Sequence, residues 1–128
     1  MNKYLGIDWG MKRIGLALAD EEIKIASPWK VVENIEEVLR AIEEENIDVA
    51  VLGVPYKMHN REAKPQTEFS NFLKDLKAGA SVKIETVDER LSSKTADSFI
   101  GDKKTKAPRD AASAMVILQQ FLDMMSSD

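Results

Sequence analysis

Residues 4–19 read YLGIDWGMKRIGLALA, and this stretch is the clearest indication of how the fold begins. Residues 4–9 are apolar except for Asp8, residues 13–19 form a second apolar run, and Gly10 lies between the two. Short apolar runs on either side of a glycine turn predict a pair of antiparallel strands. We expect a third strand over residues 23–32, and Pro28 predicts that this strand is interrupted or lies at a sheet edge.

Helical and strand patterns alternate after this opening. The first helix is predicted to begin at Asn34 as N-cap, with Glu37 as the capping partner. The valine-rich residues 48–54, stopped by Pro55, predict a strand that is covered on both faces. The next elements are a helix that Gly79 can end in a left-handed conformation, a strand over residues 82–87, a short helix ending at Gly101, and a last helix from about Pro108 to Met125. This order predicts an α/β fold with a five-stranded mixed sheet, antiparallel in its first three strands and flanked by helices.

The composition narrows the class of protein. A chain of 128 residues with 44% hydrophobic residues is expected to form one domain, residues 1–128. The absence of cysteine and the single histidine exclude a disulfide framework and leave almost no ligands for structural zinc. No leader or membrane-spanning apolar run is recognisable, so a cytoplasmic protein without a membrane or disulfide partner is expected.

Asp110 is the strongest candidate for a functional residue in the last helix. It lies one turn before Ala114 on the apolar stripe of that helix, which Ile117, Leu118, Phe121 and Leu122 continue. A carboxylate on an inward face is costly unless it is paired or coordinated. The alternative is a negative charge favoured simply by its place near the helix N-terminus.

Further carboxylates are expected at strand ends. Asp8 interrupts an apolar strand before a glycine turn, where it either serves a site or accepts hydrogen bonds from turn N–H groups. Asp88 and Glu89 follow the fifth strand, and strand alternation allows only one of the two to point to a given face. Three carboxylates without histidine or cysteine would form a hard oxygen site suited to one or two Mg²⁺ or Mn²⁺ ions.

The net charge of −4 argues against a protein that coats nucleic acid through an overall positive field. Basic residues nevertheless gather in three segments, and each cluster taken alone is more typical of a solvated loop. These are Lys12 and Arg13 after the first strand, Lys57 and Arg61 in a central loop, and Lys103, Lys104, Lys106 and Arg109 in a late loop. His59, in the same central loop, is expected to be a surface residue.

Four segments together resemble the YqgF family of pre-16S rRNA nucleases, which are also described as Holliday-junction-resolvase-like. The similar segments are residues 5–15, LGIDWGMKRIG; 53–55, GVP; 88–93, DERLSS; and 110–119, which open with DAA and close with ILQ. The similarity covers essentially the whole chain. The sequence departs from the family in residues 56–61, YKMHNR, where members often carry an Asp-Gly pair.

The resemblance implies a ribonuclease H-like fold and a metal-dependent hydrolase acting on phosphodiester bonds. It places the catalytic and metal-binding carboxylates at Asp8, Glu89 and Asp110, and it makes Lys12, Arg13 and Arg90 candidates for phosphate contact. Lys103, Lys104 and Arg109 directly precede Asp110 and are expected to help orient the nucleic-acid backbone. The implied function is 5′-end processing of pre-16S ribosomal RNA, with RNA favoured over branched DNA.

Three alternatives remain open at this stage. The first is a Holliday-junction resolvase, and the second is a non-catalytic nucleic-acid-binding or transcription-regulatory module. The third, an actin-like ATP-binding domain, would use the glycine-containing hairpin for phosphates, but the chain has room for only one of the two domains that such ATPases pair. A monomer and a weak homodimer are both compatible with the sequence.

Overall fold

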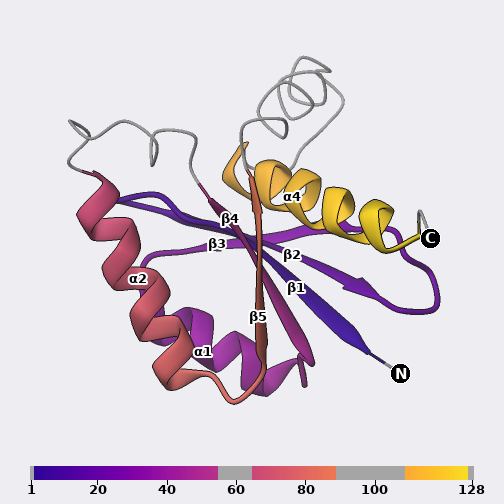
Figure 1. Cartoon of the computed structure of the whole chain (residues 1–128), viewed down its shortest axis with the longest axis horizontal. Helices are drawn as coiled ribbons and strands as arrows, with labels where there is room; N and C mark the ends of the chain where they lie inside the picture. The colour runs from indigo at the N-terminus through magenta and orange to yellow at the C-terminus, as the bar shows by residue number, and fades with distance from the viewer. Residues whose placement is uncertain (1, 55–64, 89–108, 127–128) are drawn as a thin grey trace.

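The computed structural model describes residues 2–54, 65–88 and 109–126 (Figure 1). Along the chain the described elements are β1 (Lys3–Asp8), β2 (Ile14–Asp20), β3 (Ser27–Val32), α1 (Ile35–Glu44), β4 (Val49–Val54), α2 (Pro65–Gly79), β5 (Lys83–Asp88) and α4 (Arg109–Ser126). The short helix predicted before Gly101 and the predicted helix start at Pro108 lie outside the described residues. None of the described helices is both long and apolar enough to cross a membrane.

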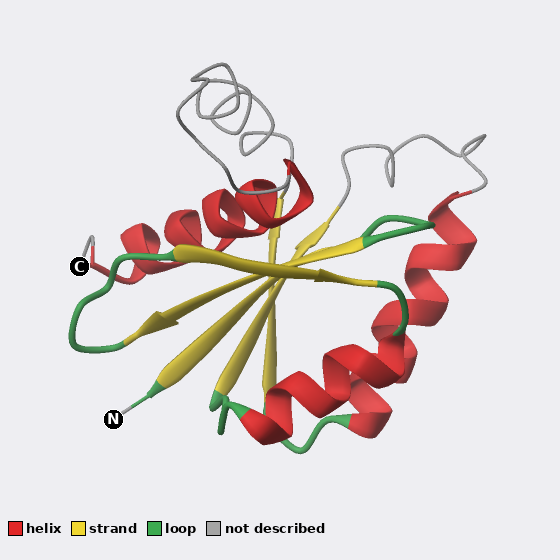
Figure 2. Cartoon of the chain, turned by 180° about the vertical axis from the view of Figure 1, so that it is seen from behind, coloured by secondary structure: helices red, strands yellow, loops and turns green. Residues whose placement is uncertain are grey.

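The strands form one five-stranded sheet in the order β3-β2-β1-β4-β5. β1 pairs antiparallel with β2, and β2 pairs antiparallel with β3, whereas β4 is parallel to both β1 and β5. Helix α4 covers one face of this sheet, and α1 and α2 cover the other (Figures 1 and 2). The predicted mixed sheet flanked by helices is therefore confirmed.

β3 lies at the sheet edge, as Pro28 predicted, and its pairing with β2 shifts register between Leu16 and Ala17. The predicted start at residue 23 is wrong, because β3 begins at Ser27. Before it, the Ile23 N–H donates to Asp20 Oδ1 (2.7 Å) and Lys24 adopts a left-handed φ of 58°. These features make a turn of residues 20–24, so the strand starts later than predicted.

Helix α1 begins where the sequence predicted. Asn34 has an extended backbone, and its side chain accepts a hydrogen bond from the Glu37 N–H (2.9 Å). The Glu37 carboxylate in turn accepts from the backbone N–H of Glu33 (2.7 Å), one residue earlier than a standard capping box uses. The cap fixes the entry of the chain into α1 after the edge strand.

The two faces of the sheet are packed very differently. On the α1–α2 face, large side chains fill the space between the layers, among them Leu5, Ile7, Leu16, Leu52 and Phe69. On the α4 face, the strands present glycine and alanine at several positions, and a Cβ on Gly6 would lie 2.7 Å from the Ala114 carbonyl oxygen. Helix α4 therefore lies close to the strand backbones, with Ile117, Leu118 and Leu122 as its buried stripe.

Gly79 ends α2, but not in the left-handed conformation that the sequence suggested, because no glycine among the described residues has a positive φ. Its role is steric. A Cβ at Gly79 would lie 2.7 Å from a terminal methyl of Leu39, so glycine allows the end of α2 to approach α1.

Candidate functional site

Asp8 is the one charged side chain that is buried among the described residues, with 9% of its surface exposed. It is the last residue of β1, at the end of the sheet where the parallel strands β1, β4 and β5 terminate. Burying a carboxylate costs free energy unless it interacts with a donor or a cation. The position at a strand end is as expected from the sequence, and the burial adds that the carboxylate lies within the packed layers rather than on a turn surface.

The register of the first hairpin determines what lies beside Asp8. Asp8 is paired with Gly15 of β2, and directly opposed residues of antiparallel strands point to the same face. A Cβ built on Gly15 would overlap the backbone carbonyl of Asp110, at the start of α4. Asp8 therefore points to the α4 face, and the first turn of α4 lies directly against its cross-strand neighbour.

Asp110 is partly buried, with 31% of its side chain exposed. It lies in the first turn of α4, where the helix macrodipole favours a negative charge, and it also borders the sheet. Asp110 therefore lies both near the helix N-terminus and against the sheet, and its role as a ligand stays a prediction. Its Oδ2 atom lies 3.4 Å from Nε of Arg13, the residue that precedes β2.

The other predicted residues are distributed as follows. Lys12 and Arg13 are exposed in the connection between β1 and β2, which spans residues 9–13. Glu89, Arg90, Lys103 and Lys104 lie outside the described residues, as do Lys57, His59, Arg61 and Lys106. Arg109 is the first residue of α4, and only its backbone is described.

The structure decides which face Asp88 belongs to. Val87 is buried in the core beneath α4, whereas Ile84 packs on the α1–α2 face. Side chains alternate along a strand, so Asp88, the last residue of β5, shares the face of Ile84. Asp88 is therefore on the opposite face from Asp8 and Asp110.

A divalent metal fits the chemistry of this end of the α4 face. Asp8 and Asp110 supply carboxylate oxygens, the donors that Mg²⁺ and Mn²⁺ prefer, and the Arg13 guanidinium beside Asp110 shows that the place accepts positive charge. Within the described ranges, no group of three or more acidic, histidine or cysteine side chains is close enough to hold a metal. A third protein ligand would have to come from residues beyond those ranges.

Comparison with known proteins identifies the family. The model of the RuvX family, described as Holliday junction resolvase, matches residues 2–124. The chain belongs to the RuvX family. Curated relatives include one from Endomicrobium trichonymphae, 31% identical over the full length of both chains, and one from Maridesulfovibrio salexigens, 34% identical over 94% of this chain and 97% of the relative. Both carry the name "putative pre-16S rRNA nuclease", so the predicted family is confirmed.

The fold of this RuvX-family chain is also that of solved resolvases. The structure of Thermus thermophilus RuvC in complex with a Holliday junction superposes with a TM-score of 0.69 at 14% identity, covering 99% of this chain and 97% of RuvC. At this identity the likeness concerns the fold alone, and it confirms the ribonuclease H-like prediction. Membership of the RuvX family, with relatives named as nucleases, does not support the alternative of an actin-like ATP-binding domain.

One residue of this site was not given a role from the sequence. Gly15 was recognised as part of a motif, but the contact between its backbone and Asp110 was not predicted. The available signal was a glycine inside an apolar strand, which often marks a point where another backbone comes close. The sequence could not show which backbone that would be.

Proposed function

We propose that this chain is a cytoplasmic, single-domain nuclease that hydrolyses phosphodiester bonds near the 5′ end of precursor 16S ribosomal RNA and requires Mg²⁺ or Mn²⁺. The observation that carries the proposal is the convergence of Asp8 and Asp110 on the α4 face through Gly15. The curated relatives support the choice of RNA by their name.

Glu89 is the third proposed ligand. Asp88 lies on the wrong face to join Asp8 and Asp110, and this favours its neighbour in the sequence, as the family resemblance also does. Asp8, Glu89 and Asp110 would then hold one or two ions between them. The chemistry that such ions supply when bound is activation of a water nucleophile and neutralisation of the charge on the leaving oxygen.

The remaining residues act on the substrate backbone. Arg13 and Lys12 are exposed in the β1–β2 connection, and Arg13 lies beside Asp110, so both are suited to contact the phosphates on either side of the scissile bond. Phosphate contacts of this kind position a nucleic acid without reading its sequence. We extend the same role to Arg90, Lys103, Lys104 and Arg109, because they adjoin Glu89 or Asp110 in the sequence.

A second candidate function is resolution of Holliday junctions. It is favoured by the description of the RuvX family and by the RuvC fold. The same carboxylates would serve, because the bond broken is again a phosphodiester. A dimer could present two sites to a symmetric junction, whereas RNA processing is compatible with a monomer.

The test is cleavage of a labelled, 5′-extended rRNA precursor fragment and of a labelled four-way DNA junction, each with Mn²⁺ or with EDTA. We expect metal-dependent cleavage of the RNA by the wild type, loss of cleavage in Asp110→Asn, and retained cleavage in the control Asp75→Asn on the other side of the sheet. Cleavage of the junction alone would favour the resolvase. If neither substrate is cut while binding persists in EDTA and in Asp110→Asn, the chain is a non-catalytic module.

A further inference from the structure

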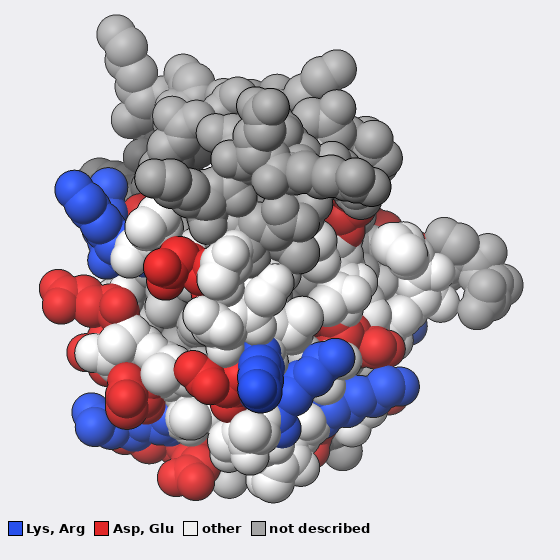
Figure 3. Space-filling view, turned by 60° about the vertical axis from the view of Figure 1, so that its left-hand side comes forward, with Lys and Arg blue, Asp and Glu red and all other residues white. Residues whose placement is uncertain are grey.

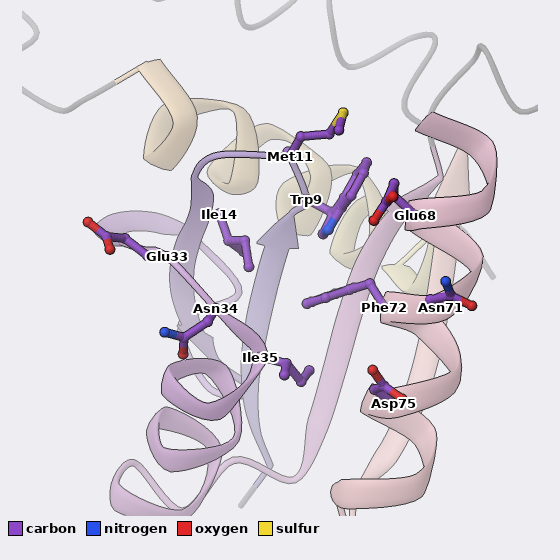
Figure 4. Close-up of a pocket in the computed structure, with 11 residues that line it drawn as sticks. Trp9, Met11, Ile14, Glu33, Asn34, Ile35, Glu68, Asn71, Phe72 and Asp75 are labelled. Carbon is purple, nitrogen blue, oxygen red and sulfur yellow. The ribbon is translucent and has the colours of Figure 1, made fainter. Parts of the chain in front are cut away.

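A groove opens on the α1–α2 face of the sheet (Figure 4). Asp110 belongs to α4, which covers the opposite face. The groove has a volume of about 220 Å³ and lies between the β1–β2 connection, the start of α1 and the first half of α2. Its apolar walls include Trp9, Ile14, Ile35 and Phe72, and Figure 4 shows the Phe72 ring pointing into it from α2. This α1–α2 groove has no part in the proposed nuclease site.

The walls of the groove are held in place by aromatic packing. The Trp9 ring meets Phe69 edge-on, with 5.7 Å between ring centroids, and lies 6.4 Å from Phe72. Ile14 and Phe72 are buried, whereas Trp9 keeps part of its surface exposed. The groove therefore offers a fixed aromatic and aliphatic surface rather than a gap between loose side chains.

All the charged residues that line the groove are acidic. Glu33, Glu68 and Asp75 line it together with two asparagines, and none of its lining residues, all within the described ranges, is lysine or arginine. An anion such as a nucleic-acid phosphate is therefore disfavoured. The described side chains of the α2-bearing face also show basic and acidic groups interspersed, without the continuous basic surface that RNA would require (Figure 3).

A bare metal ion does not fit the groove either. The acidic side chains come from separate positions, and among the described residues no three acidic groups are close enough to share one metal. A cation with an apolar body suits the groove better. Aromatic rings attract cations over their faces, tryptophan most strongly, and carboxylates bind the planar guanidinium through paired hydrogen bonds.

We propose that the α1–α2 groove binds an arginine side chain presented by a partner protein. The methylene stem would pack between Ile14, Ile35 and Phe72, and the guanidinium would lie against Trp9 beside Glu68. Asp75, seven residues further along α2, would add negative charge at the other end of the groove. Pockets for drug-sized ligands usually have volumes of about 300–1,000 Å³, so a groove of about 220 Å³ suits one long side chain better than a nucleotide.

The groove and the α4 face lie on opposite sides of the sheet, so both can bind a partner at the same time. Asp8 points to the α4 face, and the next residue, Trp9, packs on the α1–α2 face. A protein held on the α1–α2 face would leave the α4 face free for nucleic acid. The inference goes beyond the proposed function, because arginine binding at this groove requires neither metal nor RNA.

The test uses ¹⁵N-labelled, metal-free protein and nuclear magnetic resonance. The probe is the peptide acetyl-Ala-Leu-Arg-Leu-Ala-amide at millimolar concentration, with a matched peptide that carries glutamine in place of arginine. The chain has two tryptophans, so the indole N–H of Trp9 reports on the groove. Trp29, whose ring already carries Lys30 Nζ at 4.3 Å from its centroid, serves as the internal reference. We expect the arginine peptide to shift Trp9 and the neighbouring α2 amides but not Trp29.

Charge variants then separate specific binding from general attraction to an acidic protein. Glu68→Gln with Asp75→Asn removes two exposed groove charges and is expected to weaken binding about fivefold, through loss of the ion pair with Glu68 and of the longer-range attraction by Asp75. Glu43→Gln with Glu44→Gln makes the same change of net charge on α1, away from the groove, and is expected to change the affinity less than twofold.

Three results would overturn the proposal. The first is equal shifts with the arginine and glutamine peptides, and the second is equal weakening by the two double variants. The third is a shift of Trp9 with protein concentration alone, which would make a second copy of this chain the occupant. Both double variants change only exposed side chains, so both are expected to fold. Their amide spectra check this directly.

Discussion

The two faces of the sheet differ in how closely a helix approaches them. On the α4 face, Gly6, Gly15 and Gly53 bring the helix against the strand backbones, so that Asp110 lies beside Gly15 and its cross-strand partner Asp8. On the α1–α2 face, large side chains keep the helices at a distance, and a groove remains at the rim. Close packing thus places the carboxylates, and wider packing leaves room for a ligand.

The difference follows from strand alternation in the first hairpin. In β1, residues 4, 6 and 8 point to the α4 face, whereas Leu5 and Ile7 point to the other. The α4 face therefore receives Tyr4, a glycine and an aspartate, and the other face receives aliphatic side chains. A shift of the strand by one residue would exchange the two sets, bury Asp8 among the aliphatic side chains of the other face and move it away from Asp110.

The largest expected effect comes from a methyl group on the α4 face. Gly15→Ala places a Cβ onto the Asp110 carbonyl, a backbone atom that cannot move without displacing α4. We expect the free energy of unfolding to fall by about 3 kcal/mol, at the upper end for overpacked sites, and nuclease activity to be lost. Urea denaturation followed by circular dichroism measures the change in stability.

Gly79→Ala is the matched control on the other face. Its Cβ meets only the end of the Leu39 side chain, which can rotate, and alanine is favoured over glycine in a helix by about 1 kcal/mol. We expect a change of less than about 1 kcal/mol in either direction. Equal destabilisation by the two variants would show that the two faces do not differ in tolerance.

Much of this arrangement could be predicted from the sequence because its signals are local. Apolar runs around Gly10 gave the hairpin, the Asn34 cap gave the start of α1, and helical spacing placed Asp110 on the buried side of α4. The family resemblance then selected Glu89, which the sequence pattern alone could not separate from Asp88. The face of Asp88 became clear only from the packing of Val87 and Ile84.

The rest depends on contacts between distant segments. A Cβ at Gly15 is excluded by the backbone of α4, a helix that begins about ninety residues later in the chain. No local sequence pattern predicts this contact. The same holds for the groove, whose walls come from three separate segments. The turn before β3 differs from the prediction for another reason: Ile23 and Ile25 are 63% and 64% exposed, so these apolar residues do not mark a buried strand.

A second, smaller effect tests whether the α4 face is where the metal binds. In the wild type, Mg²⁺ at about ten times its Kd should stabilise the folded chain by about 1.4 kcal/mol, or roughly 4 °C in Tm. We expect Asp8→Asn to abolish this shift, because it removes a buried ligand on that face. Calorimetry with Mg²⁺ and with EDTA measures it.

Asp75→Asn removes a carboxylate of the same type from the α1–α2 side and should keep the full Mg²⁺-dependent shift. If both variants lose the shift, the ion acts through overall charge rather than at a site on one face. If Asp8→Asn keeps it, the assignment of Asp8 as a ligand is wrong.

The smallest expected effect concerns the ion pair between Arg13 and Asp110 at the start of α4. Arg13 is 72% exposed and Asp110 31% exposed, so their contact at 3.4 Å should contribute less than about 1 kcal/mol to stability. Its consequence for metal binding should be clearer, because the guanidinium and the metal compete for one carboxylate. We expect Arg13→Gln to raise the Mg²⁺ affinity about threefold, since a pair of this exposure is worth a fraction of a kcal/mol, while weakening the binding of RNA.

Lys12→Gln is the matched control, because it removes the same charge one residue away. It should weaken RNA binding with a smaller gain in Mg²⁺ affinity. Titration calorimetry with Mg²⁺, and RNA binding in Ca²⁺, separate the two effects. If both variants change the Mg²⁺ affinity equally, Arg13 acts only through its charge, and its contact with Asp110 is no part of the site.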